Sequence, residues 1–362
     1  TAGTTSSPPS PQGCPSVDSP DTSTAAGWLG YLAAHQADIS LTIEDGRGAF
    51  VEHRAQEPAP AASAAKVVHL LAYAAAVNAG RFSPDQPVPI ADWEAWYLPG
   101  LDGGAHGAAL QAIGVANDGV RAADPAGTVR MDDIVAAMIE FSDNAAADYL
   151  RHLLGDASLR AAGAAGGAAE LELPSYLGEA IALLVPADAP KPGLSRPDRA
   201  AVQLALAQRY MSDPHYRVRV QATPAPALAA QQEWAESTTA TTALALAALH
   251  KKLSTTASED PTDVGAADAR RQLEWPPVPP GAIALGVKGG AYPGVINEAM
   301  TLRRQDGTTA VAVLLVRRMP ADAWTAGLTS FAHQELLLAA LQDPAILDRL
   351  SCAVGGGSTI PR

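Results

Sequence analysis

The chain has 362 residues, 48% of them apolar, and a formal net charge of −13 at pH 7. This length allows a large buried core in one domain or in two packed lobes. The acidic charge argues against nucleic acid and anionic membrane surfaces as partners. No unbroken apolar run of about eighteen residues predicts a membrane span.

Residues 1–24 are rich in Ser, Thr and Pro, and this composition predicts a flexible tail. The chain starts at Thr1 without a Met or a signal peptide, so we expect a processed product.

The two cysteines are Cys14 and Cys352. We favour a disulfide that joins the two ends of the chain, over two unrelated thiols. A lipidated Cys14 is disfavoured because thirteen residues precede it and no apolar residue stands directly before it. A disulfide requires an oxidising compartment, so we expect a secreted protein.

The first elements follow the tail. Helical apolar spacing after the N-cap Thr24 predicts a helix over 24–36. Residues 39–55 predict two strands around a turn. Residues 63–80 are apolar nearly all round and predict a helix in the centre of the molecule.

The pattern from 81 to 275 is helical, and the stretch 155–196 gives no clear assignment. The candidate helices are 130–140, 143–154, 198–211 and 240–253. Strand patterns return at 282–290, 295–305 and 308–319, and a long amphipathic helix is predicted over 322–342.

Strands at both ends of the chain with helices between them predict an α/β lobe plus an all-α lobe. We expect a five-stranded antiparallel sheet, flanked by the first and last helices, with the helical domain inserted between strands. The α/β lobe would hold 25–80 and 276–352, and the helical lobe 81–275. The two termini would then run side by side, which suits a Cys14–Cys352 bridge.

Three short motifs carry the chemistry: SAAK (63–66), SDN (142–144) and KGG (288–290). Ser63 and Lys66 stand three positions apart, so in a helix they lie on one face. A serine hydroxyl needs a base to become a nucleophile, and a lysine serves only if its pKa is lowered by burial or a nearby cation. Lys288 is a candidate for that cation.

The other motif residues fit the same reaction. Ser142 could relay a proton to the leaving group, and Asn144 could orient Lys66 and a substrate carbonyl. Gly290 would let a substrate lie along the strand edge, where the backbone N–H groups of Ser63 and Ala291 could hold an oxyanion. Each motif alone has a structural reading: a chance serine, a helix N-cap, and a strand end followed by a turn.

In this order, the three motifs resemble the serine β-lactamase and penicillin-binding-protein superfamily, class A β-lactamases most closely. The resemblance covers about residues 25–350, and the segments 99–110 and 236–253 also resemble relatives. It implies that Ser63 is the acylated nucleophile and Lys66 its base. It also implies that Ser142 is the proton relay, Asn144 an anchor for the substrate and lysine, and Lys288 an electrostatic partner.

Two departures from the family concern the substrate. Gly289 stands where relatives carry a hydroxyl that helps to hold the substrate carboxylate. Asn297 and Glu298 stand where some relatives place a carboxylate-binding arginine. Both departures favour a substrate without that carboxylate, or one that is held differently.

A third departure concerns deacylation, because class A enzymes use a loop glutamate to activate water. The candidates here are Glu170, Glu172 and Glu179, and Pro174 replaces the asparagine of the family pattern. Solvated or capping glutamates are the alternative. Without such a glutamate, a penicillin acyl-enzyme would be long-lived.

We therefore expect a secreted serine hydrolase that acts on an amide, lactam or ester of a small-molecule or peptide-like acyl substrate. A DD-carboxypeptidase or acyl transferase, slowly deacylated by water, and a non-catalytic binding protein that keeps the fold are alternatives. The eight histidines and two cysteines show no metal-ligand spacing, so no metal or cofactor is expected. The oligomeric state stays open.

Overall fold

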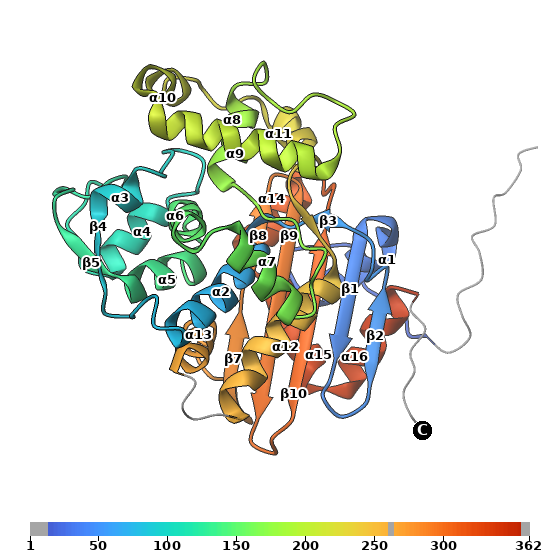
Figure 1. Ribbon diagram of the computed structural model, residues 1–362. Coiled ribbons are helices and arrows are strands. Elements are labelled where there is room, and N and C mark those ends of the chain that lie inside the picture. The colour runs from blue at the N-terminus through green and yellow to red at the C-terminus, as the bar shows by residue number, and fades with distance from the viewer. Residues whose placement is uncertain (1–13, 260–263, 356–362) are drawn as a thin grey trace, which may run out of the picture.

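A central antiparallel sheet organises the molecule in the computed structural model, which describes residues 14–259 and 264–355 (Figure 1). Its strands are β1 (Ile39–Glu44), β2 (Phe50–His53), β7 (Ala282–Val287), β8 (Gly290–Tyr292), β9 (Val295–Arg304) and β10 (Thr309–Val316). The strand order is β2-β1-β10-β9-β7, and β8 also pairs with β9. The sheet thus has six strands where the sequence predicted five.

The extra strand arises from a break in the segment predicted as one strand over 282–290. Lys288 and Gly289 belong to neither strand, and the chain resumes pairing with β9 at Gly290. Two short pairs lie outside this sheet: β3 (Ala59–Pro60) with β6 (Ala240–Thr241), and β4 (Pro87–Pro89) with β5 (Thr128–Arg130).

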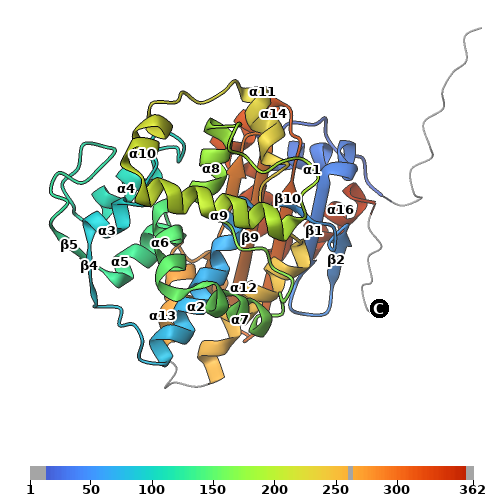
Figure 2. The same ribbon diagram turned by 45° about the horizontal axis from the view of Figure 1, so that its top comes forward.

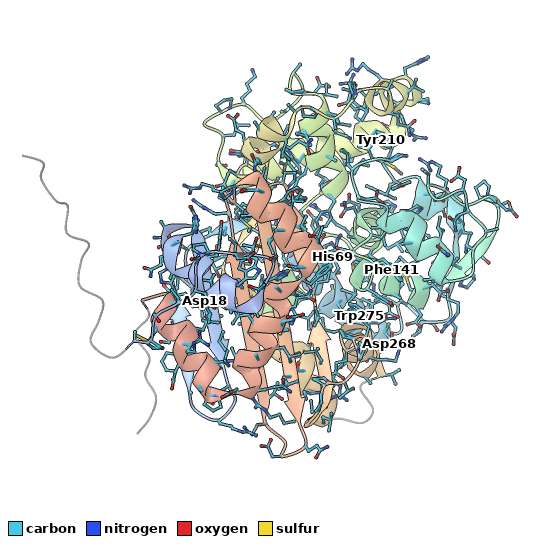
Figure 3. All side chains as sticks on the ribbon, turned by 180° about the vertical axis from the view of Figure 1, so that it is seen from behind. Asp18, His69, Phe141, Tyr210, Asp268 and Trp275 are labelled. Atoms are coloured by element: carbon cyan, nitrogen blue, oxygen red, sulfur yellow. A yellow bond between two sulfur atoms is a disulfide. The ribbon has the colours of Figure 1, made fainter. Side chains whose placement is uncertain are left out.

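Helices from both ends of the chain cover the back of the sheet (Figure 3). They are α1 (Ala25–Ala34), α14 (Ala321–Ser330), α15 (Ala332–Gln342) and α16 (Pro344–Ala353). The single helix predicted over 322–342 is wrong, because Phe331 adopts a left-handed φ of 54° that separates α14 from α15. The short 3-10 turn Gln36–Asp38 follows α1.

The front of the sheet packs against α12 (Ala243–Glu259) and, at β7, against α13 (Val264–Leu273). The helix α2 (Val67–Asn78) packs against these two helices. Side chains alternate along β10, since Val313 joins the front core while Leu314 joins the back core. The helix predicted from residue 63 begins instead as a 3-10 turn, Ala62–Lys66, and only then continues as α2.

The remaining helices lie in the first part of the range 81–275 predicted as the helical lobe, whereas α12 and α13, in its last part, pack on the sheet. The remaining helices are α3 (Ile90–Glu94), α4 (Ala105–Ala112), α5 (Met131–Ile139), α6 (Asn144–Leu154), α7 (Asp156–Ala165), α8 (Tyr176–Leu184), α9 (Arg196–Ser212), α10 (Pro214–Gln221) and α11 (Leu228–Ala235). The unassigned stretch 155–196 therefore contains α7 and α8. Helices α8 to α10 gather around a small core of their own, and α9 crosses the front of the molecule (Figure 2).

The two ends of the chain meet on the sheet's back side, where Cys14 and Cys352 form a disulfide with 5.7 Å between their Cα atoms. The predicted pairing is confirmed. Residues 14–24 of the expected tail pack along this face, since the Thr22 hydroxyl donates to the Ala323 carbonyl at 2.6 Å and Val17 contacts the back core. Residues 1–13 lie outside the described residues. Within the described ranges, no helix is long and apolar enough to cross a membrane.

Candidate active site

Ser63 and Lys66 share the 3-10 turn that opens the central helix, and both are buried. In a 3-10 turn, positions three apart eclipse each other, and Lys66 Nζ lies 2.9 Å from Ser63 Oγ. Nζ also donates to Asn144 Oδ1 at 2.7 Å and to the Ser142 carbonyl at 2.6 Å. Residues from the first two motifs, 76 to 81 positions apart along the chain, thus surround one nitrogen.

The pKa of Lys66 is unusual for a lysine. Burial, and then the neighbouring cation of Lys288, lower its pKa well below the ordinary value. A lysine with a lowered pKa supplies neutral amine near neutral pH, and that amine can accept a proton from a serine hydroxyl.

Ser142 lies in the loop between α5 and α6, with a left-handed φ of 64°. For a non-glycine residue this conformation carries strain that the surroundings must offset. The next residue, Asp143, supplies the anchor: it accepts hydrogen bonds from Trp93 Nε1 and from the Ala145 N–H, both at 2.9 Å, and pairs with His106 Nδ1 at 2.9 Å. Ser142 is therefore held by a buried polar network.

The Ser142 hydroxyl lies between two lysines. Lys288 Nζ donates to Ser142 Oγ at 2.9 Å and to the Gly289 carbonyl at 2.7 Å, and Lys66 Nζ lies 3.4 Å from Ser142 Oγ. Burial lowers the pKa of Lys288 to about 8, although the carboxylate of Glu298 opposes the shift. The contacts make a continuous polar chain from Ser63 through Lys66 and Ser142 to Lys288.

Gly290 brings β8 against the turn that carries Ser63. A Cβ at Gly290 would lie 2.6 Å from the Ser63 backbone nitrogen and 2.7 Å from that of Ala64. Only a glycine fits this approach without displacement. Ala291 is the next residue of β8, and it pairs with Ile296 of β9.

The three candidate glutamates occupy different surroundings. Glu170 is exposed. Glu172 pairs with Arg196 and accepts a hydrogen bond from the Ala240 N–H at 2.9 Å.

Glu179 is buried in α8, and burial raises its pKa. It accepts hydrogen bonds from the Thr239 N–H and the Tyr292 hydroxyl, both at 2.8 Å. In the described part of the chain, none of the three glutamates hydrogen-bonds to Ser63 or Lys66.

Tyr176 lies beside Lys66, and sequence reasoning missed it. Its ring centroid lies 4.4 Å from Lys66 Nζ, and its hydroxyl donates to the Ala62 carbonyl at 3.3 Å. Asp148, on α6, holds this segment by accepting from the N–H groups of Tyr176 at 3.2 Å and Leu177 at 2.7 Å. No spacing in the sequence connects positions 66, 148 and 176, so this contact could not be predicted.

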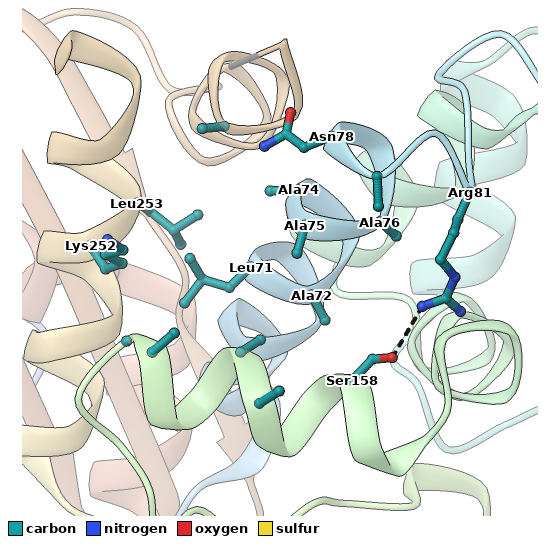
Figure 4. A pocket seen from close by; sticks show the side chains of 16 residues that line it. Leu71, Ala72, Ala74, Ala75, Ala76, Asn78, Arg81, Ser158, Lys252 and Leu253 are labelled. Carbon is teal, nitrogen blue, oxygen red and sulfur yellow. Dashed lines mark hydrogen bonds between the residues drawn. The ribbon is translucent and has the colours of Figure 1, made fainter. Parts of the chain in front are cut away.

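Of two hollows in the described structure, only one is lined by predicted site residues. The more apolar, of about 450 Å³, lies among α2, α7 and α12 and contains none of the predicted site residues (Figure 4). Another, of about 540 Å³, is lined by Ser142, Lys288, Gly289, Gly290 and Ala291. Among the residues described, no group of His, Cys, Asp and Glu side chains could hold a metal ion.

The sequence model of the β-lactamase enzyme family matches residues 29–334, most of the chain. This chain belongs to the β-lactamase enzyme family. The members of this family are serine hydrolases, so the protein is an enzyme of that class. No curated protein sequence matches the chain significantly.

Solved structures share the fold at low sequence identity. A β-lactamase from Sphaerobacter thermophilus is 16% identical with a TM-score of 0.55, and the match covers 85% of this chain and 95% of that one. An ancestral class A β-lactamase is 16% identical with a TM-score of 0.54, covering 87% and 99%. A β-lactamase from Chitinophaga pinensis is 14% identical with a TM-score of 0.52, covering 87% and 99%. The molecule therefore has the β-lactamase/transpeptidase-like fold.

Proposed function

We propose that this protein is a serine hydrolase that works through a Ser63 acyl-enzyme on an amide, lactam or ester. The observation that carries the proposal is the hydrogen-bonded buried pair Ser63 and Lys66, with 2.9 Å between Oγ and Nζ. Neutral Lys66 takes the hydroxyl proton while Ser63 Oγ attacks the substrate carbonyl. The N–H groups of Ser63 and Ala291 hold the developing oxyanion.

Collapse of the tetrahedral intermediate then requires a proton on the leaving group. Ser142 supplies it: its hydroxyl gives a proton to the leaving group and takes one from the Lys66 ammonium, which returns Lys66 to the neutral amine. The contact with Lys288 holds the Ser142 hydroxyl in place. Lys288 stabilises the negative charge that develops on Ser142 Oγ while the Ser142 proton moves to the leaving group. Asn144 keeps the Lys66 amine in place through its Oδ1 and presents its amide to the acyl group.

Deacylation by water is slow in this proposal. Tyr176, not a carboxylate, lies beside Lys66, and Glu172 and Glu179 are engaged elsewhere. None of the three candidate glutamates hydrogen-bonds to Ser63 or Lys66 in the described part of the chain, so none of them is placed there to activate water at the acyl group. This observation favours the second candidate function as an acyl transferase over rapid lactam hydrolysis. It does not favour a DD-carboxypeptidase, which needs water for its second step. The substrate is a small-molecule or peptide-like acyl compound.

We also propose that the protein is secreted, because the Cys14–Cys352 disulfide needs an oxidising compartment to persist. The matching measurement is the redox state of both cysteines in protein recovered from the culture medium and from cells. Reduced thiols in all recovered protein would contradict secretion.

The test of the reaction is intact-protein mass over time with a fluorophosphonate, benzylpenicillin and an activated ester. Wild type is compared with Ser63→Ala, and with Ser83→Ala as a matched control at an exposed serine. We expect adducts in wild type and in the control, none in Ser63→Ala, and a penicillin adduct that persists. Rapid loss of that adduct would restore a water-activating group to the mechanism. No adduct with any reagent would favour the non-catalytic binder.

A further inference from the structure

The hollow of about 540 Å³ next to Ser142 and Lys288 is where the leaving group of a substrate would lie. In the proposed reaction, Ser142 donates its proton to that leaving group. The residues that line the hollow therefore decide which leaving groups fit. Its ionisable lining residues are Glu140, Lys288, Glu298 and His333, and no arginine is among the described lining residues.

Glu298 is the most unusual of these residues. It lies on β9 across from Gly289, since the Lys288 N–H donates to the Ala299 carbonyl and Gly290 pairs with Asn297. Its side chain is 1% exposed. A buried carboxylate without a cation is costly, so its partners are informative.

The partners leave this carboxylate incompletely satisfied. Oε2 accepts from Gln334 Nε2 at 2.6 Å and lies 3.6 Å from His333 Nε2. Oε1 is buried and has no hydrogen-bond partner among the described residues. Lys288 does not hydrogen-bond to this carboxylate among the described residues. Its ammonium donates instead to Ser142 and to the Gly289 carbonyl.

Gly289 lies directly against the Glu298 carboxylate. A Cβ at position 289 would lie 2.9 Å from Glu298 Oε2 and 3.2 Å from Oε1. Any larger side chain would have to displace the carboxylate or cover it. Only a residue without a side chain lets this carboxylate stay here, where both Gly289 and Glu298 line the hollow.

Aromatic side chains complete the wall of this hollow. Phe141, Trp275 and Phe331 line it, and Trp275 and Phe331 are 44% and 53% exposed. Figure 3 labels Phe141 and Trp275, which lie close together between the sheet and the helical part. Aromatic faces attract cations, and together with a carboxylate they favour a positively charged group that has an apolar body.

We propose that Glu298 is a specificity-determining residue that binds a cationic group on the leaving-group part of the substrate. The substrate class is then an ester, thioester or amide whose leaving group carries an ammonium or guanidinium. A leaving group with a carboxylate is repelled by Glu298 and Glu140. This inference rests on the proposed Ser63 reaction and names the substrate class for it.

The test uses three thioesters of one acyl group that differ in the thiol. The thiols are thiocholine, its uncharged carbon analogue 3,3-dimethylbutanethiol, and 3-mercaptopropionate. The rate of Ser63-dependent thiol release is measured for each and divided by the rate of its hydroxide-catalysed hydrolysis, which corrects for leaving-group reactivity. We expect thiocholine release to exceed the uncharged analogue about tenfold, or about 1.4 kcal/mol, and mercaptopropionate to be slowest.

Two variants assign the preference to this carboxylate. Glu298→Gln should bring the thiocholine-to-neutral ratio close to one, whereas Glu335→Gln, an exposed glutamate on the neighbouring helix α15, should keep the ratio. Gly289→Ser gives a second test should Glu298→Gln fail to fold, because a side chain there must also lower the ratio.

The outcomes separate this inference from the proposed function. Thiol release without a preference for the cation, or with an unchanged ratio in Glu298→Gln, overturns the inference and leaves the acyl-enzyme reaction standing. Absence of any Ser63-dependent release overturns the proposed reaction and the inference with it.

Discussion

The ring of Tyr176 lies over the Lys66 amine, 4.4 Å from ring centroid to Nζ. The ring has two opposite effects on the Lys66 pKa. Its face attracts the ammonium form, but its bulk excludes water from the amine. Burial is the larger effect, since the pKa of Lys66 is lowered well below its ordinary value. In the proposed reaction, Tyr176 is a positioning residue that keeps water away from the Lys66 amine.

Replacing Tyr176 by Ala should admit water and raise the Lys66 pKa. The acylation rate, which needs neutral Lys66, should then reach half its plateau at a pH about one unit higher. Tyr176→Phe keeps the ring and should stay close to wild type. The measurement is the rate of fluorophosphonate labelling from about pH 5 to about pH 10. A profile that is unmoved in Tyr176→Ala would remove this role from the ring.

In the proposed reaction, Lys288 acts on both the base Lys66 and the relay Ser142, so Lys288→Met should have two effects. Loss of the cation raises the Lys66 pKa and moves the acylation profile to higher pH, and loss of the 2.9 Å contact leaves Ser142 without its partner. We expect labelling at neutral pH to fall by about 10²-fold or more. Lys251→Met removes a surface ion pair with Glu44 and is the matched control. Equal rates in the two variants would argue against an electrostatic role for Lys288.

Gly290→Ala should disturb the Ser63 turn directly. The added Cβ would lie 2.6 Å from the Ser63 nitrogen, so β8 or the turn must move. We expect an acylation rate lower by about 10²-fold, since small displacements of reacting groups have effects of this size. Gly127→Ala is the control, because its nearest contacts are an ordinary 3.4 Å and 3.5 Å. Wild-type labelling in Gly290→Ala would show that the close approach is not needed.

His106 predicts a dependence of stability on pH. Burial lowers its pKa, but hydrogen bonds and charges from Asp143 and Glu94 outweigh burial and raise it to about 9, above the ordinary 6.5. A raised pKa in the folded state stabilises the protein fully below pH 6.5, and this stability is lost as pH rises through about 9. The loss is on the order of 3 kcal/mol.

The measurement is the free energy of unfolding between about pH 6 and about pH 10. His106→Asn should be less stable at neutral pH, because Asp143 and Glu94 lose their cation, and the decline between these limits should shrink. His152→Asn, at an exposed histidine, should follow wild type. A wild-type free energy that is constant over this interval would contradict a protonated His106.

The sequence alone determined the features that local pattern encodes. Short apolar runs next to Asp-Gly turns predicted the strands β1, β9 and β10. All three strands are buried on both faces of the sheet, which explains their apolar composition. The spacing of Ser63 and Lys66 predicted their contact, since positions three apart meet on any helical turn. The motif order indicated the family, and the family model bears this out. The disulfide followed from the two cysteines and the expected meeting of the termini.

Only the tertiary structure decided what depends on long-range packing. The break between α14 and α15 depends on the left-handed conformation of Phe331. No glycine or proline stands at this position to predict it. The contact of Tyr176 with Lys66 joins α8 to the central helix across 110 positions, and no periodicity reports such a distance.

The same holds for Glu298. The sequence indicated that a carboxylate-binding arginine is missing. Only the fold shows that the Glu298 carboxylate is buried opposite Gly289, with one oxygen lacking a hydrogen-bond partner among the described residues. The physical reason is that a chain's local pattern fixes which face a side chain takes, whereas its partners and its desolvation are set by elements far away in the sequence.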